Sequence, residues 1–140
     1  MNLRRMAENY IGIAADCLKQ ARSSLKAKDY PLTVRRAQEC VEMSLKAVLR
    51  SIGVEYPKEH DVSKALDISG NKFPSWFSSK IPKFMEISKD LSKKRGPAMY
   101  GYESEMKPSS DIFDKEDATS AISSAKDVFE ACKKLIETPS

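Results

Sequence analysis

Apolar residues recur every three or four positions along most of this chain, and charged residues fill the positions between them. That spacing places one apolar stripe along a helix, so it predicts amphipathic helices. The first predicted helix runs from Leu3 to about Lys26, and the second from Pro31 to about Ile52, before Gly53. Pro31 suits the first turn of a helix, where its missing N–H leaves no hydrogen bond unmade. Two long helices with so short a link are expected to lie antiparallel and to pack their stripes together.

The rest of the chain alternates polar connections with further apolar stripes. Turn-forming residues separate these stripes, so the pattern predicts helices joined by loops. The expected elements, in chain order, are a loop at 54–60, a short helix from about Asp61 to Ile68, a turn at 69–72, an aromatic segment at 74–79, a helix from Pro82 to Arg95, an exposed polar loop at 103–110 and a last helix from about Asp114 to Glu137.

Length and composition favour one helical domain. A chain of 140 residues with 41% hydrophobic content can bury a single core, so we expect residues 1–140 to form one domain. Glycine is scarce and no segment alternates with a period of two, which favours an all-α fold, an up-and-down bundle of four to five helices. No apolar run reaches the roughly 20 residues that span a bilayer, and the N-terminus lacks a signal peptide's apolar stretch. We expect a soluble cytoplasmic protein without membrane contact.

The cysteines and the charge exclude several kinds of site. Cys17, Cys40 and Cys132 lie far apart without a close cysteine or histidine companion, so neither a zinc spacing nor a disulfide framework is present. We expect free, buried thiols, no metal and no cofactor. The net charge of +4 is mild, whereas dedicated nucleic-acid binders usually carry a larger, clustered excess. The charge therefore permits RNA contact without arguing for it.

The segment from Arg95 to Tyr102 is the strongest candidate for a functional site. Gly96 and Pro97 are expected to stop the preceding helix, which would leave a guanidinium and two phenols, Tyr100 and Tyr102, just past its end. Arg95 could bind phosphate, or it could simply complement the dipole at a helix C-terminus. Tyr100 is interpreted as a packing aromatic, and Tyr102, beside the polar loop, as the more accessible phenol.

Other residues carry competing interpretations. His60 is the chain's only histidine, and it is interpreted as a structural residue whose ring bonds backbone and fixes a turn. The aromatic group Phe73, Trp76 and Phe77 could stack bases, but such a group more often closes a core or covers a dimer face. The lysines that precede Arg95, at positions 89, 93 and 94, could steer RNA or form a solvated flank.

One ordered set of residues points to a family. The run Ala37-Gln38-Glu39 to Leu45-Lys46-Ala47, then Gly53 and His60-Asp61, resembles a HEPN domain (higher eukaryotes and prokaryotes nucleotide-binding) over nearly the whole chain. The resemblance implies a bundle of four or five helices that commonly forms a homodimer. It also implies a separate minimal nucleotidyltransferase as a partner, and no phosphate loop for that activity occurs in this chain.

Many members of that family are metal-independent ribonucleases whose motif is an arginine followed, after a short spacer, by a histidine. On this pattern Arg95 matches the arginine, and Tyr100 stands at the expected histidine position. In one branch the motif ends in a tyrosine that the partner can adenylylate, and Tyr102 falls on that position. A tyrosine, with a pKa of about 10 against about 6.5 for histidine, is a poor general base near neutral pH. The ribonuclease motif is thus degenerate.

These observations give two functional hypotheses. The first is a HEPN-like protein of a toxin–antitoxin pair that acts with a separate nucleotidyltransferase, with Arg95 binding RNA or nucleotide phosphate and Tyr102 open to modification. If the chain is an enzyme, it is a metal-independent endoribonuclease that uses Arg95 and Tyr100. The alternative is a non-catalytic dimeric module that binds a nucleotide or a protein.

Overall fold

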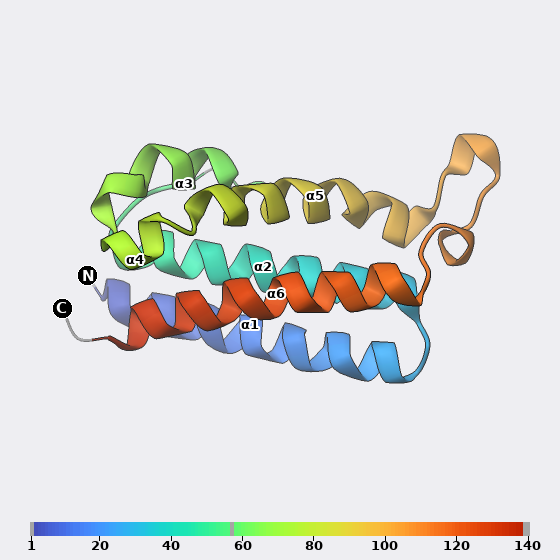
Figure 1. Ribbon diagram of the computed structural model, residues 1–140, viewed down its shortest axis with the longest axis horizontal. Helices are drawn as coiled ribbons and strands as arrows, with labels where there is room; N and C mark the ends of the chain where they lie inside the picture. The colour runs from blue at the N-terminus through green and yellow to red at the C-terminus, as the bar shows by residue number, and fades with distance from the viewer. Residues whose placement is uncertain (1, 57, 139–140) are drawn as a thin grey trace.

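The computed structural model describes residues 2–56 and 58–138 and shows an all-α bundle, as the sequence predicted (Figure 1). The predicted loop at 54–60 is seen on both sides of Pro57, which lies outside the described residues. The α-helices are α1 (Leu3–Lys26), α2 (Tyr30–Ser51), α3 (Ser63–Ser69), α4 (Ser75–Ser78), α5 (Ile81–Tyr100) and α6 (Lys115–Glu137), and the short 3-10 turns are η1 (Gly70–Lys72), η2 (Glu103–Glu105) and η3 (Ser109–Asp111).

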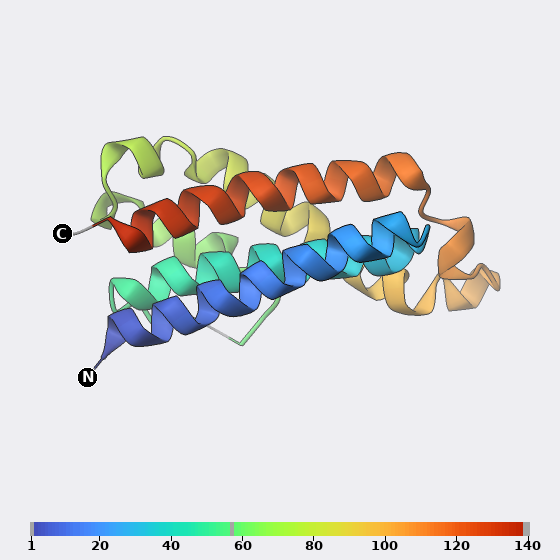
Figure 2. The same cartoon turned by 90° about the horizontal axis from the view of Figure 1, so that it is seen from below.

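Helix α2 is the centre of the bundle, because α1, α5 and α6 all pack against it. Figures 1 and 2 show the four long helices side by side, with α3 and α4 at the end where both termini lie and residues 101–113 at the opposite end. None of the helices in the described part of the chain is long and apolar enough to cross a membrane.

Local capping fixes where the predicted helices start. The Asp29 side chain accepts a hydrogen bond from the backbone N–H of Leu32, and Pro31 follows in the first turn of α2. At the start of α6, Asp114 and Asp117 each accept a hydrogen bond from the other's backbone N–H, at 2.9 and 3.0 Å. This reciprocal pair is a capping box, which satisfies two N–H groups that a helix start leaves unpaired.

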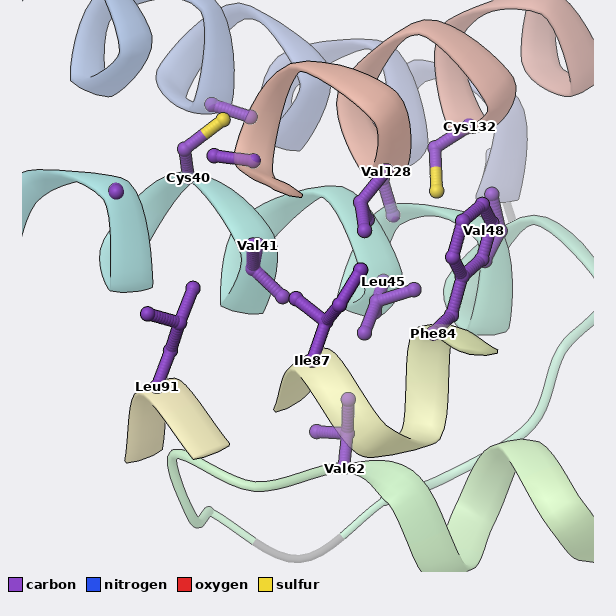
Figure 3. Close-up of a cluster of buried hydrophobic side chains, with 14 of the residues drawn as sticks. Cys40, Val41, Leu45, Val48, Val62, Phe84, Ile87, Leu91, Val128 and Cys132 are labelled. Carbon is purple, nitrogen blue, oxygen red and sulfur yellow. The ribbon is translucent and has the colours of Figure 1, made fainter. Parts of the chain in front are cut away.

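The core joins the inner faces of α1, α2, α5 and α6, and one part of it lies between α2, α5 and α6. Figure 3 shows side chains from the three helices meeting there. They include Val41, Leu45 and Val48 of α2, Phe84, Ile87 and Leu91 of α5, and Val128 and Cys132 of α6. Full burial of such apolar side chains stabilises the fold by roughly 1.5–3 kcal/mol each, before the cost of ordering the chain.

The cysteines and the aromatic group belong largely to this core. Cys40 and Cys132 are completely buried and Cys17 is half-buried, and all are free thiols. Burial raises the pKa of the Cys40 thiol to about 12, so it stays protonated. Phe73 and Phe77 are buried, with ring centroids 4.9 Å apart. The core interpretation of these two rings is confirmed, and neither is open for stacking on a base.

The predicted end of the Arg95 helix is wrong. Helix α5 continues through Gly96 and Pro97 and ends at Tyr100, five residues beyond Arg95. A proline inside a helix removes one hydrogen bond and crowds the preceding turn, at about 3 kcal/mol. In the last turn Ala98 is buried in the core, and the N–H of Gly101 donates to the carbonyl of Pro97 at 2.8 Å. Both features lower the net cost of the internal proline.

Gly101 is the residue that ends α5. Its φ of 68° lies in the left-handed region that glycine adopts without strain. A Cβ at this position would collide with the backbone oxygen of Lys107 and would lie 2.9 Å from the backbone nitrogen of Ser109. The tight return is closed by two hydrogen bonds between the backbones of Tyr102 and Lys107, at 2.8 and 3.1 Å. Residues 102–107 are therefore an ordered turn, exposed as predicted.

Candidate functional site

Arg95 is held against α2 by side-chain hydrogen bonds. Its Nη1 donates to Oε1 of Gln38 at 2.8 Å and to Oε2 of Glu39 at 3.1 Å. The Arg95 side chain is 18% exposed, so it is largely buried between the two helices. Because α5 extends past Arg95 and these bonds go to α2, this residue does not cap the end of its own helix. It joins the two helices.

Glu39 lies between two guanidiniums. Its Oε1 accepts from Nη1 of Arg36 at 2.6 Å, while its Oε2 accepts from Arg95. Burial alone would raise the pKa of Glu39, but the two arginines outweigh it, and the net pKa lies below the ordinary value. The carboxylate is thus ionised at neutral pH, and it holds one arginine on each of its two oxygens. Paired guanidiniums are well suited to bind a phosphate group.

Tyr100 and Tyr102 lie on the surface at the end of α5. Tyr100 is 64% exposed and Tyr102 is 41% exposed, so the packing interpretation of Tyr100 is wrong and the expected order of accessibility is reversed. The physical reason is that α5 continues to Tyr100, which therefore occupies an exposed position at the end of the helix. Both phenols line an open hollow of about 490 Å³, whose other residues are Gly96, Pro97, Gly101, Glu103, Ser104 and Glu105. Arg95 is not among the residues that line it.

A second group of polar side chains continues from Gln38 along α2. The Nε2 of Gln38 donates to Oε1 of Glu42 at 3.0 Å, and Nζ of Lys46 donates to Oε2 at 2.7 Å. The Nδ1 of His60 lies 2.7 Å from the same Oε1. The prediction that the His60 ring bonds backbone is wrong, because the ring pairs with a side chain of α2. Gln38, which is buried, therefore joins Arg95 to Glu42.

The Glu42 carboxylate is ionised. Burial alone would raise its pKa, but the hydrogen bonds from Lys46, Gln38 and His60 outweigh it, so the pKa lies below the ordinary value. An ionised carboxylate only accepts hydrogen bonds. The Nδ1 of His60 must therefore carry the proton in this contact, and Nε2 is left as the free ring nitrogen when the imidazole is neutral.

The sequence pattern did not indicate the hydrogen-bond network around Gln38. The spacing of Arg35 from Glu39 and of Glu42 from Lys46 is the i, i+4 spacing of helical ion pairs, and that was the available signal. Nothing local in the sequence links position 60 to position 42 or position 95 to position 38. Those contacts depend on how α5 and the α2–α3 connection pack on α2.

The lysines next to Arg95 resemble a solvated flank more than a binding cluster. Lys89 and Lys93 are exposed, and Nζ of Lys94 pairs with Asp90 of its own helix at 2.9 Å. Within residues 2–56 and 58–138, no group of at least 3 His, Cys, Asp or Glu side chains is arranged to hold a metal ion.

Comparison with known proteins identifies related chains. A family model described as "HEPN domain" matches residues 7–135. The solved structure of TT1696 from Thermus thermophilus is similar at a TM-score of 0.75 and 20% identity, over 96% of this chain and 98% of that one. The solved structure of ST0689, an archaeal HEPN homologue, is similar at a TM-score of 0.69 and 23% identity, over 94% of this chain and 98% of that one. No curated protein matches the chain.

Proposed function

Because this chain belongs to the HEPN domain family, we propose that it acts in the cytoplasm with a separate minimal nucleotidyltransferase, as one half of a toxin–antitoxin pair. In this proposal Arg95 binds a phosphate of RNA or of a nucleotide. Tyr102 is the phenol that the partner modifies. The observation that carries the proposal is the placement of Tyr102 on the surface, on a backbone turn that is fixed on both sides.

The turn around Tyr102 holds its phenol at the surface, where a partner protein can reach it. Its backbone is held by Lys107, and Gly101 sets the direction in which the chain leaves α5. The hollow beside the ring carries Glu103 and Glu105, which would repel a free nucleotide's phosphates. The hollow is therefore a poor nucleotide site by itself, and the proposal has the nucleotide arrive in the partner's active site.

The contacts that Arg95 makes support a role in binding phosphate. Glu39 holds Arg36 and Arg95 on the same carboxylate, so their positions are fixed before a ligand binds. Such preorganisation lowers the entropic cost of ordering the two long side chains on binding. A phosphate would compete with Glu39 for the guanidiniums, which predicts binding that weakens as salt increases.

We further propose a homodimer that forms through the outer face of α1. Met6 and Ile13 are 43% and 40% exposed, and half-buried Tyr10 and Cys17 continue the same row at helical spacing. An apolar row of this kind is costly to leave in water. A second copy of the same helix face would cover it.

The experiment is incubation of the purified chain with the nucleotidyltransferase encoded beside its gene, together with ATP. The proposal predicts the mass gain of an adenylyl group, located on Tyr102 by peptide mapping. Tyr100→Phe is the matched control, because it removes the neighbouring and more exposed phenol while Tyr102 remains. A chain that gains no mass, or gains it elsewhere, contradicts the proposal.

A second candidate function is a non-catalytic dimeric module that binds a nucleotide or a protein. It is favoured by the tyrosine at the expected histidine position, since Tyr100 is 64% exposed and a phenol is a poor general base near neutral pH. This module would bind its ligand without any covalent change in the chain. Retained binding of ATP or RNA, with no mass gain in the presence of the partner, would favour it.

A further inference from the structure

We propose that the cleft between α6 and the start of α5 binds a small organic acid that has one negative charge and an aromatic ring. In this proposal the ring of the ligand packs beside Trp76, and its carboxylate pairs with Lys134. Figures 1 and 2 show α4, which carries Trp76, at the end of the bundle where both termini lie, opposite the turn at 101–113. The inference therefore does not depend on Tyr102 or on the proposed function.

The cleft has the size of a small-molecule site. Its volume is about 630 Å³, within the range of about 300–1,000 Å³ that is typical of such sites. Helices α5 and α6 both pack on α2, and the cleft lies between them. One wall comes from residues 76–84, at the junction of α4 and α5, and the other from residues 127–134 of α6. The two walls are brought together only by the fold.

The Trp76 ring is held in place on one side of the cleft. It is half-buried, and its ring meets that of Phe77 edge-on, with centroids 5.8 Å apart and planes at 90°. Phe77 is completely buried, and the hydroxyl of Ser79 donates to the backbone carbonyl of Trp76 at 3.0 Å. The indole is thus fixed before any ligand binds, which lowers the entropic cost of binding.

The base of the cleft is apolar. Phe84, which is only 3% exposed, and the half-buried Ala131 line it together with the indole. An aromatic ring placed here would leave water and would meet other rings, which pack well when they are offset or edge-to-face. This base favours a ligand with an aromatic body over a purely polar one.

The position of Lys134 directs a cation into the cleft. Its Nζ lies 4.5 Å from the centroid of the Trp76 ring, where the π electrons of the indole attract an ammonium. Glu130 precedes it by four residues, the usual spacing of a helical ion pair, but Oε1 of Glu130 lies 3.9 Å from Nζ of Lys126. The ammonium of Lys134 is therefore placed by the wall opposite its own helix, beside the apolar base.

The charges around the cleft favour a ligand with a single negative charge. Five charged side chains line it, and their formal sum is +1: Lys80, Lys83, Lys134, Asp127 and Glu130. Among the residues that the structure describes, none of these three lysines forms an ion pair. The lysines attract an anion, whereas Asp127 and Glu130 would repel the additional charges of a polyphosphate. A monocarboxylate fits this balance.

The test uses Trp76 as its own probe. Trp76 is the only tryptophan of the chain, so its indole N–H gives one NMR signal that reports on the cleft. The full chain is titrated with phenylacetate, and phenylacetamide serves as the matched ligand that lacks the charge. Phenylacetate should shift the signal and saturate at about millimolar concentration or below, as expected for so small a ligand. Phenylacetamide should bind about tenfold more weakly. ATP, a polyanion, should cause a smaller shift than phenylacetate at equal concentration.

Two variants locate the site. Lys134→Gln should weaken the binding of phenylacetate about tenfold, because the ion pair with the carboxylate is lost. The matched control is Lys115→Gln, which removes the same charge from an exposed position at the far end of α6 and should bind phenylacetate as the natural chain does. The inference is overturned by the lack of a saturable shift with phenylacetate, by equal binding of phenylacetamide, by a larger response to ATP, or by equal weakening in the two variants.

Discussion

The guanidinium of Arg95 and the side-chain amide of Gln38 are joined across α5 and α2 by a hydrogen bond of 2.8 Å, and Gln38 is only 1% exposed. A buried amide with both ends satisfied is costly to replace, because its partners lose their hydrogen bonds inside the protein. The two residues lie 57 positions apart, so this contact fastens the second half of the chain to the first hairpin.

Gln38→Leu should destabilise the fold by about 1–3 kcal/mol, since it leaves Arg95 and Glu42 each without one partner. The measurement is the free energy of unfolding in urea. Gln20→Leu is the matched control, because Gln20 is exposed on α1 and such surface changes usually stay within about 0.5 kcal/mol. Equal stability of the Gln38 variant and the natural chain would show that the buried amide contributes nothing net.

Gly101→Ala should destabilise the protein by about 1–3 kcal/mol, since the added Cβ meets the backbone of Lys107 and the positive φ strains an alanine. Gly96→Ala is the control from the same helix. It lies in open space within α5, where alanine is favoured over glycine by up to about 1 kcal/mol. The midpoint temperatures of thermal unfolding of the two variants should therefore shift in opposite directions from that of the natural chain. A shift in the same direction would mean that α5 does not end as described.

Acid should weaken the fold through Glu39, Glu42 and Asp61. The pKa of each carboxyl is lower in the folded state than its ordinary value, even though burial raises it, because hydrogen bonds from neighbouring groups dominate. The unfolded chain thus binds more protons than the folded chain in this range. The free energy of unfolding should be greatest above the ordinary carboxyl pKa of about 4 and should fall as the pH drops toward the lower folded values.

Urea unfolding at a series of pH values checks this dependence. Glu42→Gln should reduce the slope of stability against pH in the acid range, because one of the contributing carboxyls is gone. An unchanged slope would mean that Glu42 titrates alike in the folded and unfolded chains.

The proposed homodimer predicts that Ile13→Glu gives a monomer, because a charge would be buried in the contact between the two α1 faces. Light scattering after size-exclusion chromatography measures the mass. Ile68→Glu is the control, since Ile68 is 72% exposed on α3 and lies outside that face. A natural chain that is already monomeric at micromolar concentration, or an Ile13 variant that remains dimeric, would exclude this interface.

The sequence predicted the helices correctly where residues within or next to each helix determine its position. The stripe of α1, the Asp29–Pro31 start of α2 and the Asp114 start of α6 all depend on neighbours a few positions away. The end of α5 was predicted wrongly, because the local cost of Pro97 does not stop a helix whose next residue, Ala98, packs into the core. Tertiary packing decided that boundary.

The candidate site was predictable only in part. Arg95, Tyr100 and Tyr102 could be selected because they are close in sequence and match a family pattern. The sequence could not show that Arg95 turns toward Gln38 and Glu39 while the two phenols line a separate hollow. It also could not show that His60 meets Glu42, since that contact depends on the path of the α2–α3 connection.

Peptide mapping of Tyr102 after incubation with the partner nucleotidyltransferase and ATP tests the central claim most directly. The account predicts an adenylyl group on Tyr102 in the natural chain and in Tyr100→Phe, and none in Tyr102→Phe. Exposure alone would favour Tyr100, which is 64% exposed against 41% for Tyr102. Modification of Tyr100 in its place, or of neither phenol, would contradict the account.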